Sequence, residues 1–218
     1  MNGKLKTPDQ IIASLAINHP ILIVDADEVL LQFVKRLETY FPTKGYELRL
    51  ESFQLHGNIY ETKTNTASSQ ESVKKLISTF FDECVDDIPP VNGAVQALSE
   101  LSNHFQILIL SNVPERCRIR RQQSLCDLGM AFPVIANKGA KGPFVKRIVE
   151  QTNAQHSVFI DDLPPHHTSV ANHSPGTQRI HFIADKRLRD FMPKAPDAHQ
   201  RFDSWCEIKT ALLETARS

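Results

Sequence analysis

Length, composition and charge already exclude several classes of protein. The chain has 218 residues, 41% of them hydrophobic, which is enough for one sizeable core with room for an inserted subdomain. Lys plus Arg and Asp plus Glu each number 25, so the formal net charge is zero and no global field attracts nucleic acid or an anionic membrane.

Cysteine usage and the N-terminal segment bear on the cellular setting. The four cysteines are widely spaced without a C-x-x-C pair, which argues against a disulfide framework or zinc knuckle and favours a reducing, cytoplasmic setting. Thr7-Pro8 suits the start of a short leading helix, with threonine as the cap and proline at the first helical position. The apolar run from Ile11 to Ile17 is too short to span a bilayer and no small-residue cleavage site follows it. We therefore expect a soluble protein.

The predicted strands come next in chain order. Each is a short branched-aliphatic run between helical patterns, and the five runs are Ile21–Val24, Phe105–Leu110, Phe132–Ile135, Ser157–Ile160 and Arg179–Ile183. Continuous rather than alternating apolarity predicts strands buried on both faces, which is typical of a parallel sheet. Amphipathic helices separate them, one of which begins at Pro143. The pattern predicts a Rossmann-like, doubly wound α/β domain.

One interval is too long for this alternation of strands and helices. From Leu30 to the second strand there are roughly seventy-five residues, far more than a βα unit requires. Two apolar stripes at helical spacing flank an ambiguous segment, Tyr46–Tyr60, and a polar stretch. We predict a small α-helical cap subdomain over residues 31–86, with the α/β core formed by 1–30 and 87–218. Asp203–Ala216 is predicted to be a closing helix.

Polar residues cluster where the predicted strands end. In an open parallel sheet, ligands bind just beyond the carboxyl ends of the strands. The residues there are Asp25, Asp27, Ser111, Asn112, Asp161 and Asp162, and Lys138 and Lys141 precede the Pro143 helix. Four carboxylates in one crevice would repel one another unless a divalent cation lay between them, and such oxygen ligands suit magnesium. A hydroxyl and an ammonium group beside the metal favour an anion such as phosphate.

These signatures together resemble a known family. D-A-D-E-V-L after one strand, S-N after a second, a lysine at a helix start and F-I-D-D after a later strand resemble the haloacid dehalogenase superfamily of phosphohydrolases. The resemblance covers Ile21 to Ile183. It implies a Rossmann-like core with an inserted cap and hydrolysis of phosphate esters.

The resemblance also implies residue roles. Asp25 matches the nucleophile that forms an aspartyl-phosphate, and Asp27 matches the general acid and base. Ser111 matches the hydroxyl that binds the transferring phosphoryl group. Lys141 is the preferred active-site lysine and Lys138 the weaker candidate.

The Mg²⁺ site follows from the same resemblance, and two substrate contacts are predicted beside it. Asp162 matches the principal metal ligand and Asp161 a supporting acid. Asp25 and the backbone carbonyl of Asp27 complete the metal site. Asn112 and Glu28 are assigned to substrate binding.

Two positions depart from the family pattern. Glu28 stands where many relatives carry glycine, so we expect a different turn and a side chain that projects toward the insert. His166 stands where the family has an aspartate or asparagine, and it either hydrogen-bonds at the metal site or caps a helix.

Two other signals receive a structural interpretation. Residues Arg116, Arg118, Arg120 and Arg121 form a basic cluster that is more typical of a solvated helix surface than of an anion contact. The adjacent His166 and His167 diverge, and without further ligands at metal spacing they do not indicate zinc.

The combined hypothesis is a magnesium-dependent phosphatase acting on a small phosphorylated metabolite, with no nucleic-acid or membrane partner. The cap would open for the substrate and exclude bulk water when closed. A phosphomutase or a dehalogenase on the same scaffold, or a binding protein without turnover, are the alternatives. The sequence does not reveal the substrate, although aromatic residues of the insert could line its entrance.

Overall fold

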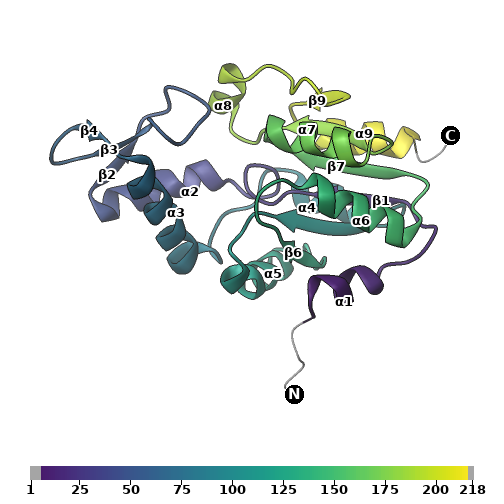
Figure 1. Cartoon of the computed structure of the whole chain (residues 1–218). Helices are drawn as coiled ribbons and strands as arrows, with labels where there is room; N and C mark the ends of the chain where they lie inside the picture. The colour runs from purple at the N-terminus through teal and green to yellow at the C-terminus, as the bar shows by residue number, and fades with distance from the viewer. Residues whose placement is uncertain (1–5, 216–218) are drawn as a thin grey trace.

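A parallel β-sheet lies at the centre of the computed structural model, which describes residues 6–215 (Figure 1). Within that range the strand order is β6-β5-β1-β7-β8-β9, and every neighbouring pair is parallel. The strands are β1 Ile21–Val24, β5 Gln106–Ser111, β6 Val134–Ala136, β7 Ser157–Asp161, β8 Gln178–Phe182 and β9 Gln200–Phe202. The predicted doubly wound α/β class is therefore confirmed. The edge strand β9 was not predicted because three residues, partly exposed, carry too short a pattern.

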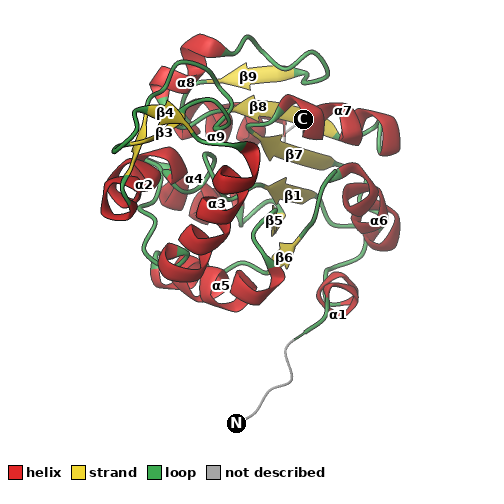
Figure 2. Cartoon of the chain, turned by 60° about the vertical axis from the view of Figure 1, so that its left-hand side comes forward, coloured by secondary structure: helices red, strands yellow, loops and turns green. Residues whose placement is uncertain are grey.

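Helices cover both faces of this sheet, as Figure 2 shows. One face packs against α1 Pro8–Ala13, α6 Gly142–Thr152 and α7 Pro164–His173, and the other against α4 Ala94–Leu101, α5 Arg118–Asp127 and α9 Trp205–Thr215. Alternate β1 side chains point to opposite faces of the sheet. Ile21 and Ile23 belong to one apolar cluster, and Leu22 and Val24 belong to the other. This burial on both faces explains the unbroken aliphatic run.

The two terminal helices agree with the sequence. Thr7 caps α1 and exchanges hydrogen bonds with Gln10, which completes a capping box. The closing helix α9 was expected to end at Ala216, which lies outside the described range. A short 3-10 turn, η2 Glu115–Cys117, precedes α5, and α8 Lys186–Phe191 follows β8. No helix among residues 6–215 is both long and apolar enough to cross a membrane.

The segment between β1 and α4 contains both helices and strands. It comprises α2 Phe33–Tyr40, η1 Phe41–Lys44, β2 Tyr46–Leu48, β3 Ile59–Glu61, β4 Thr66–Ala67 and α3 Gln70–Cys84, and we call residues 33–84 the insert. The two helical stripes are present as expected. The ambiguous segment contributes to a three-stranded antiparallel sheet that was not predicted. Gly45, at φ 79°, makes the left-handed turn from η1 into β2.

Candidate active site

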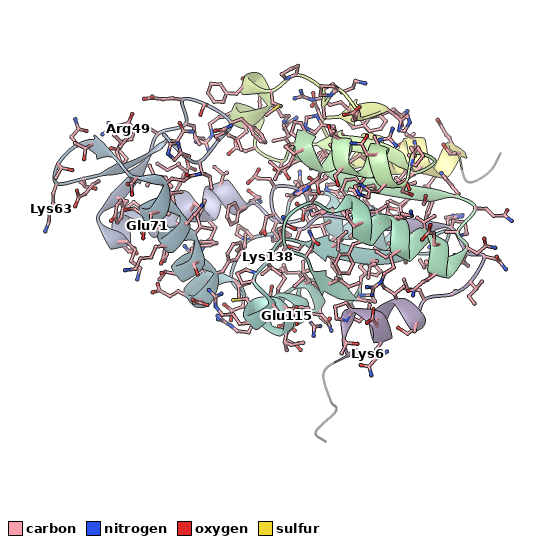
Figure 3. All side chains as sticks on the ribbon, in the orientation of Figure 1. Lys6, Arg49, Lys63, Glu71, Glu115 and Lys138 are labelled. Atoms are coloured by element: carbon pink, nitrogen blue, oxygen red, sulfur yellow. The ribbon has the colours of Figure 1, made fainter. Side chains whose placement is uncertain are left out.

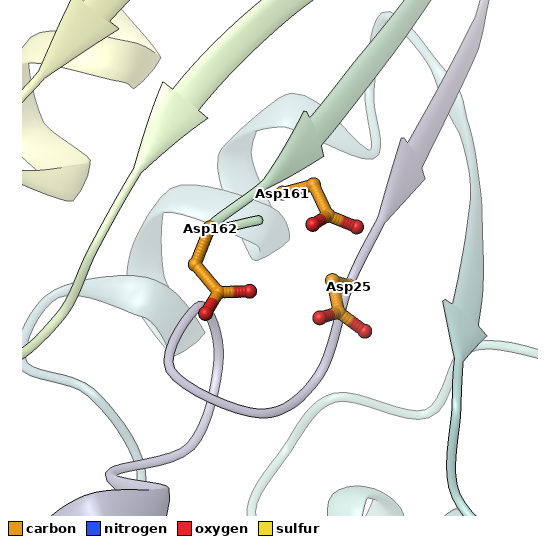
Figure 4. A group of neighbouring side chains, drawn as sticks. All are labelled: Asp25, Asp161 and Asp162. Carbon is orange, nitrogen blue, oxygen red and sulfur yellow. The ribbon is translucent and has the colours of Figure 1, made fainter. Parts of the chain in front are cut away.

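Three buried aspartates meet at the carboxyl ends of neighbouring strands (Figure 4). Asp25 directly follows β1, Asp161 ends β7 and Asp162 follows it. Their carboxylate oxygens lie within 4.8 Å of one another. The Asp25 amide donates to the Ile160 carbonyl at 2.9 Å, so the strand pairing continues to the end of the buried run and fixes the Asp25 backbone.

Lys141 reaches into this group from the start of α6. Its Nζ lies 2.7 Å from Asp25 Oδ1 and 2.7 Å from Asp161 Oδ2, and the side chain is fully buried. Gly142 makes the placement possible, because a Cβ there would come within 2.2 Å of the Ser169 carbonyl oxygen on α7. Of the two candidate lysines, the structure brings Lys141 to the site.

Lys138 is located elsewhere. It is exposed on the loop that precedes α6 (Figure 3), and within residues 6–215 it makes no ion pair. The assignment of Lys141 rather than Lys138 therefore agrees with the geometry.

The electrostatics of the group show an excess of negative charge. Burial, reinforced by Asp161 and Asp27 against the opposing effect of Lys141, raises the pKa of Asp25 to about 7. Burial, then the charges of Asp161 and Asp25, raise the pKa of Asp162 well above its ordinary value. Burial would also raise the pKa of Asp161, but the charges of Lys141, His166 and His167 and the hydrogen bond from Lys141 together lower it.

The pKa of Lys141 responds in the opposite direction. Burial alone would lower it, yet Asp161 and Asp25 together raise the pKa above its ordinary value. Lys141 is therefore a fixed positive charge, and it does not balance the carboxylates around it.

A divalent cation fits this arrangement. Both oxygens of Asp161 are occupied, Oδ2 by Lys141 and Oδ1 by the Leu163 amide at 2.9 Å. Asp25 and Asp162 retain oxygens for a ligand, and hard oxygen donors are those that Mg²⁺ prefers. Asp161 therefore suits the supporting role, and Asp25 and Asp162 suit direct coordination. The Asp27 carboxylate does not belong to the group.

Two buried histidines hold the backbone of the metal-site aspartates. His167 Nε2 donates to the Asp161 carbonyl at 3.0 Å, and His181 Nε2 donates to the Asp162 carbonyl at 2.9 Å. His181 Nδ1 accepts from the Ala195 amide, so its ring is neutral, in agreement with a pKa that burial lowers to about 4. Neither histidine was identified from sequence, because their partners are backbone atoms.

Ser111 and Asn112 lie at the end of β5. Ser111 Oγ accepts the Val113 amide at 3.2 Å, which leaves its O–H free to donate to an anion. Asn112 Nδ2 donates to the Gly139 carbonyl at 3.1 Å, and its Oδ1 accepts from Asn137 at 2.7 Å. Asn112 thereby ties the strand end to the loop that leads to Lys141.

Asp27 has a partner that the sequence interpretation missed. Arg121 Nη1 donates to Asp27 Oδ1 at 2.8 Å, and Arg121 is fully buried. The expectation of a solvated surface for the basic cluster was wrong at this residue and at Arg118, which is also buried. Arg121 lies four residues after Cys117 and four before Leu125, both buried, so its place within an apolar stripe was a signal of burial.

The remaining nitrogens of Arg121 are unusual. Nε and Nη2 are buried without a hydrogen-bond partner among the described residues. The guanidinium lies 5.9 Å from the ring of Phe81 on α3, within reach of a cation–π contact. Arg121 therefore connects the carboxylate of Asp27 with the insert.

Arg116 and Arg120 also contact the end of α3 and the turn that follows it, rather than open solvent alone. Arg116 pairs with Asp82 on α3 at 2.6 Å, and Arg120 pairs with Asp86 at 2.8 Å. These exposed ion pairs join the α5 region of the core to the end of α3.

Glu28 occupies the left-handed region, at φ 58°, where glycine is the common residue. Its carboxylate accepts the Val34 amide at 2.7 Å and the Asp185 amide at 3.0 Å. Burial raises its pKa to about 7. The side chain does project toward the insert, but both oxygens are engaged, so the geometry supports anchoring of this turn rather than the predicted contact with substrate.

Of the two roles left open for His166, helix capping is not observed, and its side-chain contact lies beside the metal site rather than on a metal-site aspartate. Its Nε2 lies 3.5 Å from Asn112 Nδ2, and its Nδ1 is buried without a partner among the described residues. Burial lowers its pKa. The ring stands in the first turn of α7, where it borders a cavity instead of capping the helix.

That cavity has a volume of about 400 Å³ and connects the acidic group with the insert. Asp25, Asp27 and Asp162 line one end, and we call these residues with Asp161 and Lys141 the floor. Phe33, Phe53, Leu55 and Phe81 line the other end, and we call them the roof. A second cavity, of about 410 Å³, shares Glu28 with the first but none of the floor residues.

Comparison with known proteins gives matches in structure alone. No protein-family profile matches the chain, and no curated protein matches its sequence. A HAD family hydrolase from Deinococcus radiodurans R1, solved with bound phosphate and sodium, superposes with a TM-score of 0.61. It is 14% identical, over 90% of this chain and 96% of that one. The chain has the haloacid dehalogenase-like fold.

Two further solved structures support this conclusion. A haloacid dehalogenase-like hydrolase from Streptococcus pneumoniae has a TM-score of 0.61 at 13% identity, over 89% of this chain and 99% of that one. A predicted phosphoglycolate phosphatase from Haemophilus somnus 129PT has a TM-score of 0.62 at 11% identity, over 89% and 98%. The resemblance inferred from motifs is thus confirmed for the haloacid dehalogenase-like fold.

Proposed function

We propose that the protein is a magnesium-dependent phosphatase that hydrolyses a small phosphomonoester through an aspartyl-phosphate on Asp25. One observation carries the proposal: Lys141 contacts Asp25 and Asp161 within a buried group of carboxylates at the strand ends. A carboxylate backed by a fixed cation and open to a cavity is suited to nucleophilic attack on phosphorus.

The first step would transfer the phosphoryl group to Asp25. One oxygen of the Asp25 carboxylate attacks phosphorus while the bond to the leaving oxygen breaks, and Lys141, 2.7 Å from Oδ1, holds the carboxylate in place. Asp27 gives its proton to that oxygen, and the alcohol departs. Arg121 would hold Asp27 in the orientation that this proton transfer needs.

The second step would release phosphate. Asp27 takes a proton from water, the water oxygen bonds to phosphorus, and the bond from phosphorus to Asp25 breaks. Ser111 donates its free O–H to a phosphoryl oxygen, and Lys141 offsets the negative charge. Magnesium, held by Asp25, Asp162 and the Asp27 carbonyl, would supply further charge stabilisation.

The insert is proposed to act as the cap that covers this site. Its roof residues lie across the cavity from the floor, which supports a role in enclosing a small substrate. We infer that the partner is a small phosphorylated metabolite rather than a nucleic acid or membrane. The four cysteines are unpaired, which agrees with the proposed cytoplasmic setting.

The test is phosphate release from acetyl phosphate and a panel of small phosphomonoesters, with magnesium and with EDTA. Wild-type protein should release phosphate only with magnesium, and Asp25→Asn should abolish release because an amide cannot form the intermediate. Lys138→Met, an exposed change near the site, serves as the matched control and should retain activity. Full activity of Asp25→Asn would refute the proposed mechanism.

A further inference from the structure

The chemistry of the cavity indicates which leaving group the site accepts. Six large apolar side chains line it, and they come from the insert, the residue before α7, and α8: Phe33, Phe53, Leu55, Phe81, Leu163 and Leu188. Leu163 directly follows Asp162 and remains 36% exposed, so an apolar surface begins immediately beside the floor.

The cavity also lacks a positive charge for a second anionic group. Among the described residues no Lys or Arg lines it, and its charged lining is acidic, from Asp25, Asp27, Glu28 and Asp162. Lys141 and Arg121, which contact the floor carboxylates, are fully buried and already paired with them. A carboxylate or second phosphate on the leaving group would therefore be desolvated beside acids without a partner.

Hydroxyl-rich leaving groups are disfavoured for a related reason. Of the described residues that line the cavity, only Gln54, Asn112 and His166 offer neutral polar side chains, and Asn112 is already held by Asn137 and Gly139. Sugar hydroxyls facing the phenylalanine and leucine side chains would lose hydrogen bonds to water without replacement.

We propose that the substrate is a phosphomonoester of an uncharged, apolar alcohol of about one aromatic ring in size. The phosphoryl group would lie against the floor, and the ring would contact Phe53, Leu55 and Leu163. Phe33 and Phe81 stack 5.6 Å apart and provide a rigid aromatic wall for it. A volume of about 400 Å³ is at the small end of the range for ligand pockets and suits such a molecule. This inference rests on the proposed function.

The deciding experiment measures binding with two matched phosphonates, which need no turnover. Benzylphosphonate and phosphonoacetate differ only in a phenyl ring against a carboxylate, and each is titrated calorimetrically into wild-type protein with magnesium. Benzylphosphonate should bind about a hundredfold more tightly, because the carboxylate has no cation to pair with. Equal or tighter binding of phosphonoacetate would overturn the inference and would indicate that Arg121 turns toward the ligand.

A charge introduced into the roof sharpens the test. Leu55→Lys places a cation in the cavity wall. The ratio of the Kd for phosphonoacetate to the Kd for benzylphosphonate should therefore fall by about tenfold or more. His56→Lys is the matched control, because His56 is the exposed neighbour on the same loop and does not line the cavity. If this Kd ratio changed equally in Leu55→Lys and His56→Lys, the roof would not contact the leaving group.

Hydrolysis measurements distinguish a failure of this inference from a failure of the proposed function. Benzyl phosphate and phosphoglycolate are the matching esters, with leaving alcohols that differ again by phenyl against carboxylate. Acetyl phosphate is too small to need the roof, so its hydrolysis reports on the floor alone. No release from any of the three compounds would refute the phosphatase, whereas release with phosphoglycolate preferred would refute only the apolar leaving group.

Discussion

The floor and the roof of the cavity differ in chemistry and in origin. The floor is charged and buried, and its residues come from strand ends and the start of α6. The roof is apolar and comes from α2, α3 and the loop between β2 and β3. From this difference we infer that the two regions have separate roles. The rigid edge of the sheet performs the phosphoryl chemistry, and the insert selects the leaving group.

The largest expected effect concerns charge balance in the floor. Lys141→Met would leave Asp25 and Asp161 buried without their cation, so the free energy of unfolding should fall by about 3 kcal/mol at neutral to alkaline pH. Urea denaturation measures the loss, and phosphate release should vanish with it. Lys138→Met, with its exposed side chain, is the control and should leave both unchanged. A stable Lys141→Met protein would contradict the charge balance described for the floor.

Magnesium should stabilise the floor in a pH-dependent way. Without metal, Asp25 has a pKa of about 7 and that of Asp162 is also raised, so between about pH 4 and pH 7 the folded state binds more protons than the unfolded state. Stability without metal should therefore fall as the pH rises through that window. At about pH 8 protons no longer compete, and magnesium at a hundred times its Kd should add about 2.7 kcal/mol.

Thermal denaturation at about pH 5 and about pH 8, with magnesium or EDTA, measures this effect. The increase in Tm should be large at the higher pH and small at the lower one. Asp162→Asn removes a proposed ligand and should abolish the increase. An equal increase at both pH values would indicate that magnesium binds outside the carboxylate group.

Arg121 contacts both Asp27 in the floor and Phe81 in the roof. A substitution at Arg121 therefore tests whether the phosphoryl chemistry and the selection of the leaving group depend on separate residues. Arg121→Met should change stability little, since two of its buried nitrogens already lack partners and methionine can fill the space. We expect kcat/KM to fall about tenfold, because Asp27 loses its orientation. Kinetics with methyl phosphate and benzyl phosphate, whose alkoxide leaving groups both need a proton, should show equal losses. A loss confined to benzyl phosphate would assign Arg121 to the roof.

The smallest effect should come from the ion pairs that join the insert to the core. Arg116→Ala and Arg120→Ala remove exposed contacts with Asp82 and Asp86. KM for benzyl phosphate should rise by no more than about threefold at low salt and be unchanged at about 0.5 M salt, where surface pairs are screened. Lys209→Ala removes an exposed core pair with Glu100 and should leave KM unchanged. A rise in KM that is the same at low and high salt would indicate that Arg116 and Arg120 act through packing rather than through their charges.

Much of the floor could be predicted because its signals are local. Asp25 and Asp162 follow aliphatic runs, and Lys141 precedes a proline at a helix start, so short patterns locate each side chain along the chain. The rule that parallel strands present their carboxyl ends at one edge then brings them together. Strand ends and helix starts are thus informative even at 11% to 14% identity to solved structures.

The α/β class and the acidic edge of the sheet follow from the sequence alone, because periodicity and strand-end residues act over a few positions. The contact of Arg121 with Asp27, which are 94 residues apart, and the apolar cavity between insert and core arise from tertiary packing. Such contacts depend on how separate elements pack against one another, and hydrophobic periodicity specifies which face is buried without specifying its partner.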